Sequence, residues 1–334
     1  MSIRAFAAKT ARQRLEPFTY DPKPLGPHEV EVAITHCGIC HSDVHLVDND
    51  WGNSGYPLVP GHEIVGTVSK RGDMVRHLEI SQRVGIGWQC DSCGTCEWCS
   101  KGEENMCHQH QAVANGHFGG FAEQVIANSQ FVFPIPDRLE SENAAPLLCG
   151  GVTVYSPMRQ YRLEPTMKAG VIGIGGLGHL ALQFANKFGC QVTAFSHSAS
   201  KEAEAKGFGA HDFVDTSDPK NLVARAGSLD FLISTVYADL DWVAYLNVLR
   251  PHGKLCFVGA ALGPVSVPVM ALMMGQKSIT GSIIGGRPMI YEMLDFAARH
   301  KVQAKTELMP MAECNTALDK VRQGKARYRM VLKN

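Results

Sequence analysis

The fold of this chain is decided by the stretch Gly173-Ile174-Gly175-Gly176-Leu177-Gly178, which has the pattern G-x-G-x-x-G. It closes a strand candidate at 170–173 and opens a helix candidate at 177–188 whose apolar residues share one face. The first glycine permits a tight turn, the second lets a pyrophosphate approach the backbone, and the third lets the helix pack closely. The N-terminus of that helix offers free N–H groups to phosphates. We therefore predict a dinucleotide-binding unit, the alternative being a glycine-rich turn without a ligand.

Short apolar runs alternate with helical patterns over residues 149–301. Strand candidates lie at 170–173, 191–196, 212–214, 231–235, 255–259 and 278–282, and a further helix candidate lies at 240–249. Six strands joined by crossover helices predict a doubly wound parallel sheet. Glycines and prolines interrupt the uncharged segment 255–275. We therefore expect a strand, a loop and a short helix at 269–274 there, rather than a membrane span.

The first part of the chain predicts β-structure instead. Val30, Val32 and Ile34 alternate with other residues, as in a half-buried strand. Further strand candidates lie at 64–68, 83–86, 121–126 and 131–135, and no long amphipathic helix is expected before about residue 140. The last segment begins extended near residue 302 and closes on a strand candidate at 328–332. With 334 residues we expect an α/β protein with two domains, a β-rich one at 1–148 and 302–334 and a nucleotide-binding one at 149–301.

Composition and charge exclude several classes of protein. Hydrophobic residues make up 45% and charged residues 19%, so the chain has enough apolar surface to fold. The 32 basic and 32 acidic residues cancel, whereas nucleic-acid or anionic-membrane binders normally carry a basic excess. Residues 1–10 lack the apolar stretch of a signal peptide, and the basic residues nearby only faintly resemble a transit peptide. We therefore expect a cytoplasmic protein.

Four of the 11 cysteines crowd into one loop. Their spacing is Cys93-x2-Cys96-x2-Cys99-x7-Cys107. A chain of this size does not need disulfide staples, so the cluster predicts a metal site in a reducing compartment. Four thiolates complete a tetrahedral zinc shell with no open position, which makes the site structural. Cys90 is near enough in sequence to replace one ligand. A nucleic-acid zinc knuckle is the rival interpretation, and the neutral net charge and the glutamates of the loop oppose it.

The end of the next predicted strand, 191–196, decides the cofactor. An Asp or Glu about 20 residues after the glycines would bind the ribose 2′-hydroxyl of NAD. Ser196 stands at that place and is followed by His197 and Lys201, so a 2′-phosphate would meet hydroxyls and an ammonium group instead of a carboxylate. The sequence therefore favours NADP(H). The alternative is that Ser200 caps a helix and Lys201 is a solvated charge.

A second set of metal-ligand residue types, Cys40, His62 and Cys149, is scattered along the chain. The spacing of these residues does not by itself identify a metal site. A single His beside a Glu, as His62 is beside Glu63, is more often a satisfied polar pair than a ligand.

Several motifs together resemble one protein family. They are Gly38-Ile39-Cys40-His41-Ser42-Asp43, Tyr56-Pro57-Leu58-Val59-Pro60-Gly61-His62-Glu63, the four-cysteine loop, Gly173–Gly178 and the ending Gly324-Lys325-Ala326-Arg327-Tyr328-Arg329. These motifs resemble the zinc-dependent medium-chain alcohol dehydrogenases, and within them the cinnamyl alcohol dehydrogenase-like branch. The chain is most similar to the bacterial NADPH-dependent zinc-type aldehyde reductases. The resemblance spans essentially the whole chain and implies a GroES-like β-rich catalytic domain plus a Rossmann doubly wound domain.

The resemblance implies a catalytic zinc site with three protein ligands. Cys40, His62 and Cys149 match these ligands, and the fourth position is open to water or substrate. Asp43 matches the carboxylate that orients His62, and Glu63 matches the acid that can approach the metal during ligand exchange. Together with the four-cysteine loop, this implies two zinc ions per chain.

A proton relay and a substrate pocket are also implied by the resemblance. Ser42 matches the hydroxyl that touches the substrate oxygen, and His45 matches the outer member of the relay. Trp51 and Trp88 are expected to line the pocket, the alternative being two core or surface aromatics. An apolar pocket would favour aromatic and medium aliphatic aldehydes.

Cofactor contacts follow from the same resemblance. Ser196 matches the polar residue of NADP-type members, and Lys201 matches the cation that binds the phosphate. His197 is a difference, because some relatives carry an Arg there. Further cofactor contacts are expected at Thr153, Val258 and Ser282.

We therefore expect a zinc-dependent enzyme that reduces aldehydes to primary alcohols with NADPH and also works in reverse. The alternatives are an NAD-linked zinc alcohol or polyol dehydrogenase and a zinc-bearing binding protein without turnover. A zinc-free quinone reductase is opposed by the complete set of cysteine and histidine ligands. The resemblance also suggests a homodimer formed through the nucleotide-binding domain, with 278–284 as an edge strand. The expected partners are small molecules, not nucleic acid or membrane.

Overall fold

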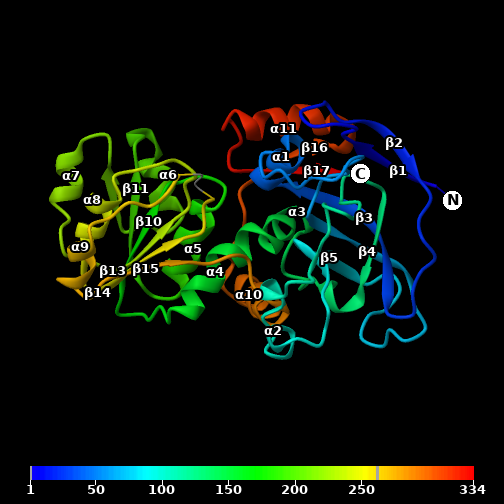
Figure 1. The fold of residues 1–334 in the computed structure, drawn as a ribbon, viewed down its shortest axis with the longest axis horizontal. Coiled ribbons are helices and arrows are strands. Elements are labelled where there is room, and N and C mark those ends of the chain that lie inside the picture. Colours follow the sequence, from blue (N-terminus) through cyan, green and yellow to red (C-terminus); the bar gives the residue numbers. More distant parts are fainter. Residues whose placement is uncertain (1, 261–262) are drawn as a thin grey trace. The chain divides into compact units, whose positions relative to one another are not determined.

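The computed structural model describes residues 2–260 and 263–334 of the chain. The chain divides into two compact units (Figure 1). Unit 1 consists of Met1–Val152 together with Ile284–Asn334, and unit 2 consists of Thr153–Ile283.

The division differs from the predicted boundaries at residues 149 and 301. Helix α10 (Arg287–His300) belongs to unit 1, although its sequence position suggests the nucleotide-binding part. Two contacts explain this. The buried Glu104 carboxylate accepts hydrogen bonds from Arg287, and Tyr291 packs edge-on against Phe133.

Unit 1 is made mostly of short strands and short helices, with 3-10 helices written as η. Its first part contains β1 (Ile3–Ala7), β2 (Glu16–Tyr20), β3 (Glu29–Ile39), α1 (His41–Asp48), β4 (Glu63–Arg71), β5 (Arg83–Ile86), β6 (Gln89–Asp91), α2 (Glu97–Ser100), η1 (Glu104–Met106), β7 (Gln111–Ala112), β8 (Gln124–Asn128), η2 (Ser129–Phe131), β9 (Phe133–Pro134), α3 (Ser141–Ala144) and η3 (Ala145–Leu148). After α10 follow β16 (Thr306–Pro310), η5 (Met311–Glu313), α11 (Cys314–Arg322) and β17 (Arg329–Lys333). Helix α4 (Gly150–Gln160) begins in unit 1 and continues into unit 2.

The main sheet of unit 1 has seven strands in the order β16-β17-β3-β4-β5-β9, and β8 also pairs with β3. Alternating apolar residues explain β3, in which Val30 and Val32 are fully buried. The strands predicted at 64–68 and 83–86 are present as part of β4 and as β5. Of the strand predicted at 121–126, only residues 124–126 form a strand, as the start of β8. The run at 131–135 keeps just the two residues of β9, because η2 takes up its start.

Two helices of unit 1 have weak sequence signals. In α1, two histidines, a serine and two aspartates interrupt the apolar periodicity. Its start is stabilised by Asp43, whose carboxylate accepts the backbone N–H of Cys40 at 2.8 Å. Its end is stabilised by Asn49, which adopts the left-handed conformation with φ of 55°. Helix α11 lies in the final segment, between the predicted extended start near residue 302 and the predicted strand at 328–332, where no helix is predicted.

Unit 2 alternates strands and helices along the chain. After α4 its elements are β10 (Lys168–Ile172), α5 (Gly178–Lys187), β11 (Gln191–Ser196), η4 (Ala199–Lys201), α6 (Glu202–Gly207), β12 (Asp212–Asp215), α7 (Pro219–Val223), β13 (Leu229–Ser234), α8 (Trp242–Val248), β14 (Leu249–Phe257), α9 (Val269–Met273) and β15 (Ser278–Gly281). Its strands form one six-stranded sheet in the order β12-β11-β10-β13-β14-β15, and every neighbouring pair is parallel. This is the predicted doubly wound sheet, in which chain order runs outward from β10 in both directions.

The uncharged segment 255–275 contains the end of β14 and the short helix α9, as predicted. Residues 261 and 262 of its loop lie outside the described residues. In the described part of the chain, no helix is long and apolar enough to cross a membrane.

The turn between β10 and α5 requires glycine at two positions. Gly173 has a φ of +86°, which side-chain-bearing residues rarely adopt. A Cβ on Gly178 would lie 1.9 Å from the carbonyl oxygen of Gly173, so only glycine lets α5 begin this close to the strand. Gly175 differs from both, because a Cβ there would meet no heavy atom within 4 Å. The second glycine of the pattern therefore faces open space, where a ligand can approach.

Candidate metal and cofactor sites

Three segments of unit 1 bring the candidate catalytic ligands together. Cys40 precedes α1, His62 precedes β4, and Cys149 follows η3. The ligand atoms of these residues and of Glu63 all lie within 4.8 Å of one another. The Sγ atoms of Cys40 and Cys149 are 4.0 Å apart. Two thiolates on one tetrahedral zinc would be about 3.8 Å apart, so the residues present fit the metal.

His62 is oriented by Asp43. Its Nδ1 lies 3.0 Å from Asp43 Oδ1, which also accepts the Gly61 N–H at 2.8 Å, and both side chains are fully buried. Burial lowers the pKa of His62, but the Asp43 charge and hydrogen bond raise it well above its usual value. The ring is therefore strongly basic. Its Nε2 is buried without a hydrogen-bond partner, and a cation at that atom would take the place of the proton.

The two thiols of the cluster differ in their acidity. A hydrogen bond donated by the Cys149 thiol holds the pKa of Cys40 well below its usual value, against the effect of burial and with help from the charge of Arg329. The same contact and burial raise the pKa of Cys149 well above its usual value. One thiolate therefore forms readily next to one thiol, and a bound cation would favour the second thiolate.

Glu63 forms a buried ion pair with Arg329 beside this cluster. Arg329 begins β17, and its Nη2 donates to Glu63 Oε1. Burial raises the pKa of Glu63 to about 7, although the charge of Arg329 opposes this shift. Glu63 Oε2 has no partner, and Gly38 makes room for it, since a Cβ there would lie 2.1 Å from that oxygen. The sequence analysis assigns no role to Arg329. The residue could have been noticed because it lies in the ending at 324–329, which resembles the family.

The candidate relay residues lie on α1. Ser42 Oγ is 3.7 Å from Cys40 Sγ, so the hydroxyl lies beside the metal cluster. His45 Nδ1 is 2.8 Å from Asp50 Oδ2, just beyond the end of the helix. Asp50 orients the His45 ring, and sequence reasoning misses it because no motif distinguishes it from other surface acids.

Two tryptophans connect the relay to the metal cluster. The ring centroids of Trp51 and His45 are 5.3 Å apart, and Trp88 packs edge-on against His62 at 4.9 Å. The two indoles are themselves 6.3 Å apart in an edge-to-face arrangement. The structure thus brings both predicted pocket residues next to candidate site residues.

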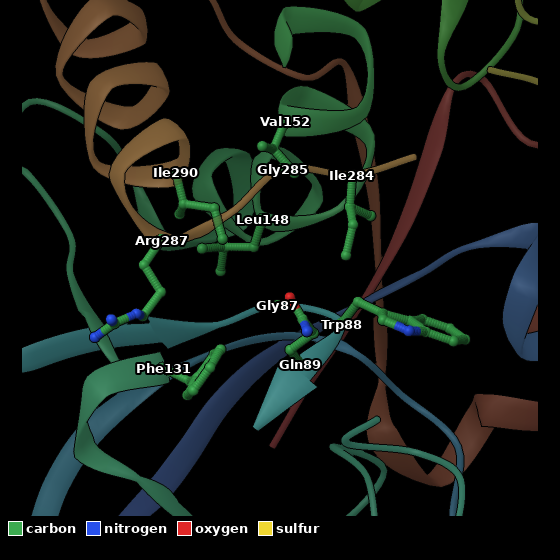
Figure 2. Close-up of a pocket in the computed structure, with 10 residues that line it drawn as sticks. All are labelled: Gly87, Trp88, Gln89, Phe131, Leu148, Val152, Ile284, Gly285, Arg287 and Ile290. Atoms are coloured by element: carbon green, nitrogen blue, oxygen red, sulfur yellow. The ribbon is translucent and has the colours of Figure 1, made fainter. Parts of the chain in front are cut away.

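Trp88 also lines a small pocket within unit 1, drawn in Figure 2. Apolar walls come from Phe131, Leu148 and Ile290, and Leu148 directly precedes the candidate ligand Cys149. Figure 2 shows Arg287 and Trp88 at opposite ends of this pocket. The lining is mostly apolar, and the volume of about 10 Å³ leaves room for a single water molecule.

The four-cysteine loop gathers its sulfur atoms as predicted from the spacing. The Sγ–Sγ distances are 3.9 Å for Cys93–Cys99 and 3.6 Å for both Cys96–Cys99 and Cys93–Cys107. All four sulfurs lie within 4.8 Å of one another, again close to the spacing on a tetrahedral zinc. Hydrogen bonds from the backbone of Thr95 and Cys96 lower the pKa of Cys93 to about 6, which favours its thiolate.

Cys90 lies outside this sulfur cluster. Its Sγ donates to the carbonyl oxygen of Gln111, and burial raises its pKa to about 12. It is therefore a neutral buried thiol, whereas the other four sulfurs suit a metal.

In unit 2, two predicted cofactor residues lie close to the glycine-rich turn. The Nζ of Lys201 donates to the carbonyl oxygen of Ile174, inside that turn, at 2.7 Å. Ser196 ends β11 and is buried, and its Oγ accepts the N–H of Ser198 at 3.1 Å. His197 is exposed. The Ser196 hydroxyl thus stands at the end of β11, where a carboxylate would select NAD, and the Lys201 ammonium group lies at the glycine-rich turn.

The remaining predicted cofactor residues are Thr153, Val258 and Ser282. Thr153 is buried in α4. Val258 and Ser282 directly follow β14 and β15, and their N–H groups donate to Ser234 and Phe257 at 3.0 Å each. Both lie at the carboxyl ends of parallel strands, which is where such sheets bind dinucleotides.

Family models match both parts of the chain. The alcohol dehydrogenase GroES-like domain matches residues 26–137, and the zinc-binding dehydrogenase model matches residues 176–299.

Similar proteins match over nearly the full length. The aldehyde reductase AdhA of a Synechocystis species is 45% identical over 330 residues, covering 99% of this chain and 98% of that protein. A cinnamyl alcohol dehydrogenase structure from Sorghum bicolor has a TM-score of 0.96 and 40% identity, covering 100% and 98% of the two chains. A Helicobacter pylori enzyme of the same name, complexed with NADP(H), has a TM-score of 0.92 and 30% identity at the same coverage. The chain therefore belongs to the zinc-dependent medium-chain alcohol dehydrogenase superfamily, in its cinnamyl alcohol dehydrogenase-like branch.

Proposed function

We propose that this chain reduces a broad range of aromatic and aliphatic aldehydes to primary alcohols with NADPH, and oxidises such alcohols in reverse. The observation that carries the proposal is the orphaned Nε2 of His62 among two thiols and a carboxylate. A buried polar nitrogen without a partner is costly, and a cation bound at that atom would remove the cost.

In this proposal, two zinc ions bind to two separate sets of ligands. Cys40, His62 and Cys149 would hold the catalytic ion, and the four-cysteine loop would hold the structural ion. When bound, zinc acts as a Lewis acid on the carbonyl group and the nicotinamide supplies the hydride. The chain keeps the His62 ring in place through Asp43, and three protein ligands would leave one tetrahedral position of the ion to the substrate oxygen.

The proton for the product oxygen would come through Ser42 and His45. The Ser42 hydroxyl lies beside Cys40, where it can donate to the reacting oxygen. His45 would restore that proton, because an imidazole near neutrality can both take and give one. Asp50 fixes the ring of His45 through the 2.8 Å contact between its Oδ2 and the ring Nδ1.

The choice of NADPH is supported by Ser196 and Lys201. No carboxylate stands at the end of β11 to repel a 2′-phosphate, and Lys201 brings its ammonium group to the glycine-rich turn. The NADP(H) complex of the Helicobacter pylori relative is in keeping with this choice.

We also infer that the chain forms a homodimer through unit 2. Strand β15 is the last in its sheet, so its outer backbone edge has no partner strand among the described residues. Large apolar side chains are exposed shortly before and after it, namely Val269, Met270, Met273, Met274 and Ile283. A second copy pairing at β15 would cover this surface, and the solution mass from light scattering tests this arrangement.

The proposed activity is tested by following NADPH absorbance after benzaldehyde is added, with NADH in parallel and with or without prior chelation. We expect fast loss with NADPH, slow loss with NADH and suppression by the chelator. A preference for NADH would overturn the cofactor choice and favour the NAD-linked alcohol or polyol dehydrogenase. No turnover of any aldehyde in a panel of aromatic and aliphatic compounds would contradict the proposed function.

A further inference from the structure

A buried carboxylate links the four-cysteine loop to the start of helix α10. Glu104 lies in η1, inside the loop, and is 1% exposed. Its Oε2 accepts the backbone N–H of Arg287 at 2.9 Å, and its Oε1 accepts the Nε–H of the same residue at 2.6 Å. Arg287 is the first residue of a 14-residue helix, so the carboxylate also meets the positive end of the helix dipole.

The backbones of the loop and the helix start are also in close contact. A Cβ on Gly286 would lie 1.9 Å from the carbonyl oxygen of Gly102, and a Cβ on Gly102 would lie 2.7 Å from Cγ of Pro288. Gln89 adds a hydrogen bond from its Nε2 to the carbonyl oxygen of Glu104 at 2.9 Å. With contacts this tight, a shift of the loop must shift the start of α10 as well.

The same residues form part of the pocket wall in Figure 2. Arg287, Ile290 and Gln89 line the pocket, and Trp88 lies at the end opposite to Arg287. The Arg287 guanidinium lies 5.7 Å from the ring centroid of Phe131, another wall residue. Because Trp88 also touches His62, the pocket lies between the four-cysteine loop and a candidate catalytic ligand.

We propose that Glu104 and Arg287 are positioning residues through which the four-cysteine loop fixes Trp88, and that the Trp88 ring contacts the apolar end of the aldehyde. The contact with the aldehyde rests on the proposed aldehyde reduction, whereas the mechanical link does not. Zinc in the loop would hold Glu104 in place. Glu104 holds Arg287 and also bonds Gln89, the chain neighbour of Trp88. A two-carbon aldehyde has little apolar surface to place against the Trp88 ring.

The kinetic test compares cinnamaldehyde with acetaldehyde in Glu104→Gln and Arg287→Met. In both variants we expect KM for cinnamaldehyde to rise about tenfold while kcat/KM for acetaldehyde changes less than about twofold. The double variant should raise KM for cinnamaldehyde no more than either single variant does, because both substitutions remove the same Glu104–Arg287 interaction. Asp295→Asn is the matched control, because it removes an exposed ion pair with Arg299 on the same helix. An equal loss for both aldehydes would overturn the proposal.

A second test does not depend on turnover. Hydrogen exchange is measured in the segments 87–90 and 285–291 of the zinc-loaded protein, with zinc content determined on the same samples. In Glu104→Gln we expect faster exchange in these two segments and unchanged exchange in β16, with both zinc ions retained. Unchanged exchange at 285–291, or faster exchange throughout unit 1, would overturn the link. If the wild type reduced no aldehyde, the proposed function would fail, and this exchange pattern alone would decide the link.

Discussion

Single carboxylates hold the candidate active site together at the residue scale. The two oxygens of Asp43 reach both sides of the metal cluster. Oδ2 accepts the Cys40 N–H at 2.8 Å, and Oδ1 accepts the Gly61 N–H and contacts His62 Nδ1. One fully buried side chain thus positions two of the three candidate ligands. The geometry of the site depends on Asp43 as much as on the ligands themselves.

Replacing one ligand tests the metal cluster at this scale. Cys40→Ser removes a thiolate and leaves a hydroxyl that binds zinc poorly, so we expect turnover to fall by about a thousandfold or more. Zinc content should drop from two ions to one, with an unchanged far-ultraviolet circular dichroism spectrum. Cys90→Ala is the control and should keep both ions, because Cys90 lies outside either cluster. Full activity in Cys40→Ser would remove the proposed catalytic metal site.

Ser196 carries a separate prediction about the cofactor. Ser196→Asp places a negative charge where the 2′-phosphate is proposed to lie, so the ratio of kcat/KM with NADPH to that with NADH should fall about a hundredfold. Lys201→Met should weaken NADPH without improving NADH, because it removes a cation and adds no ribose acceptor. Steady-state kinetics with both cofactors measure these ratios. An unchanged ratio in Ser196→Asp would show that the phosphate is recognised elsewhere.

At the scale of elements, the turn from β10 to α5 contains one glycine that the fold requires and another that only a bound ligand would require. A methyl group at Gly178 would collide with the carbonyl of Gly173, whereas one at Gly175 would meet nothing. The same substitution thus has different expected effects three residues apart.

We expect Gly178→Ala to destabilise unit 2 by about 1–3 kcal/mol, because the start of α5 must move. Gly175→Ala should melt like the wild type yet bind NADPH at least about tenfold more weakly, because the methyl group fills the space left for the pyrophosphate. Gly207→Ala, where a Cβ also meets nothing, is the control for both measurements. Thermal melting measures the stability of each variant, and fluorescence titration measures its affinity for NADPH. Wild-type affinity in Gly175→Ala would contradict a pyrophosphate at this turn.

Helix α11 carries a prediction about alkaline pH. Its first residue, Cys314, is 0% exposed, and burial raises its pKa from 9.0 to about 11. Between these values the unfolded chain loses the thiol proton while the folded chain keeps it, so stability is intact below about pH 9 and falls toward pH 11.

The urea midpoint of Cys314→Ala should therefore change less between about pH 8 and pH 10.5 than that of the wild type, although the variant starts lower because it loses packing. Part of the slope should persist, because burial also raises the pKa of Cys256 to about 11. Parallel slopes in the two proteins would show that Cys314 ionises normally.

For the whole molecule, the two metal clusters predict two stages of metal loss. The proposed catalytic site has three protein ligands, with the nearby Glu63 paired to Arg329, whereas the four-cysteine loop would supply four. Mild chelation should remove one zinc ion, abolish turnover and lower the melting temperature little. Loss of the second ion should lower it much more, since the loop has few buried residues of its own. Zinc analysis with calorimetry checks this order, and simultaneous loss of both ions would contradict it.

Much of the fold could be predicted because its patterns are local. The alternation around Val30 predicts β3, and the glycine pattern with its flanking apolar runs predicts β10 and α5. Helix α1 escapes prediction because its polar residues serve the site instead of an apolar stripe. The place of α10 in unit 1 also escapes, because its start is bound by Glu104, 183 residues earlier in the chain.

The sequence by itself determined the four-cysteine loop and the glycine-rich turn, since each has its functional groups within a few turns of chain and needs no distant partner. Only the tertiary structure decided the other site. Cys149 meets Cys40 across 109 residues, and Arg329 meets Glu63 across 266. No local pattern encodes such contacts, because they arise when separate strands and helices pack around shared cores and bring their ends together. The entropy lost in closing such long loops is offset by burial throughout unit 1, which is a property of the whole fold and not of any motif.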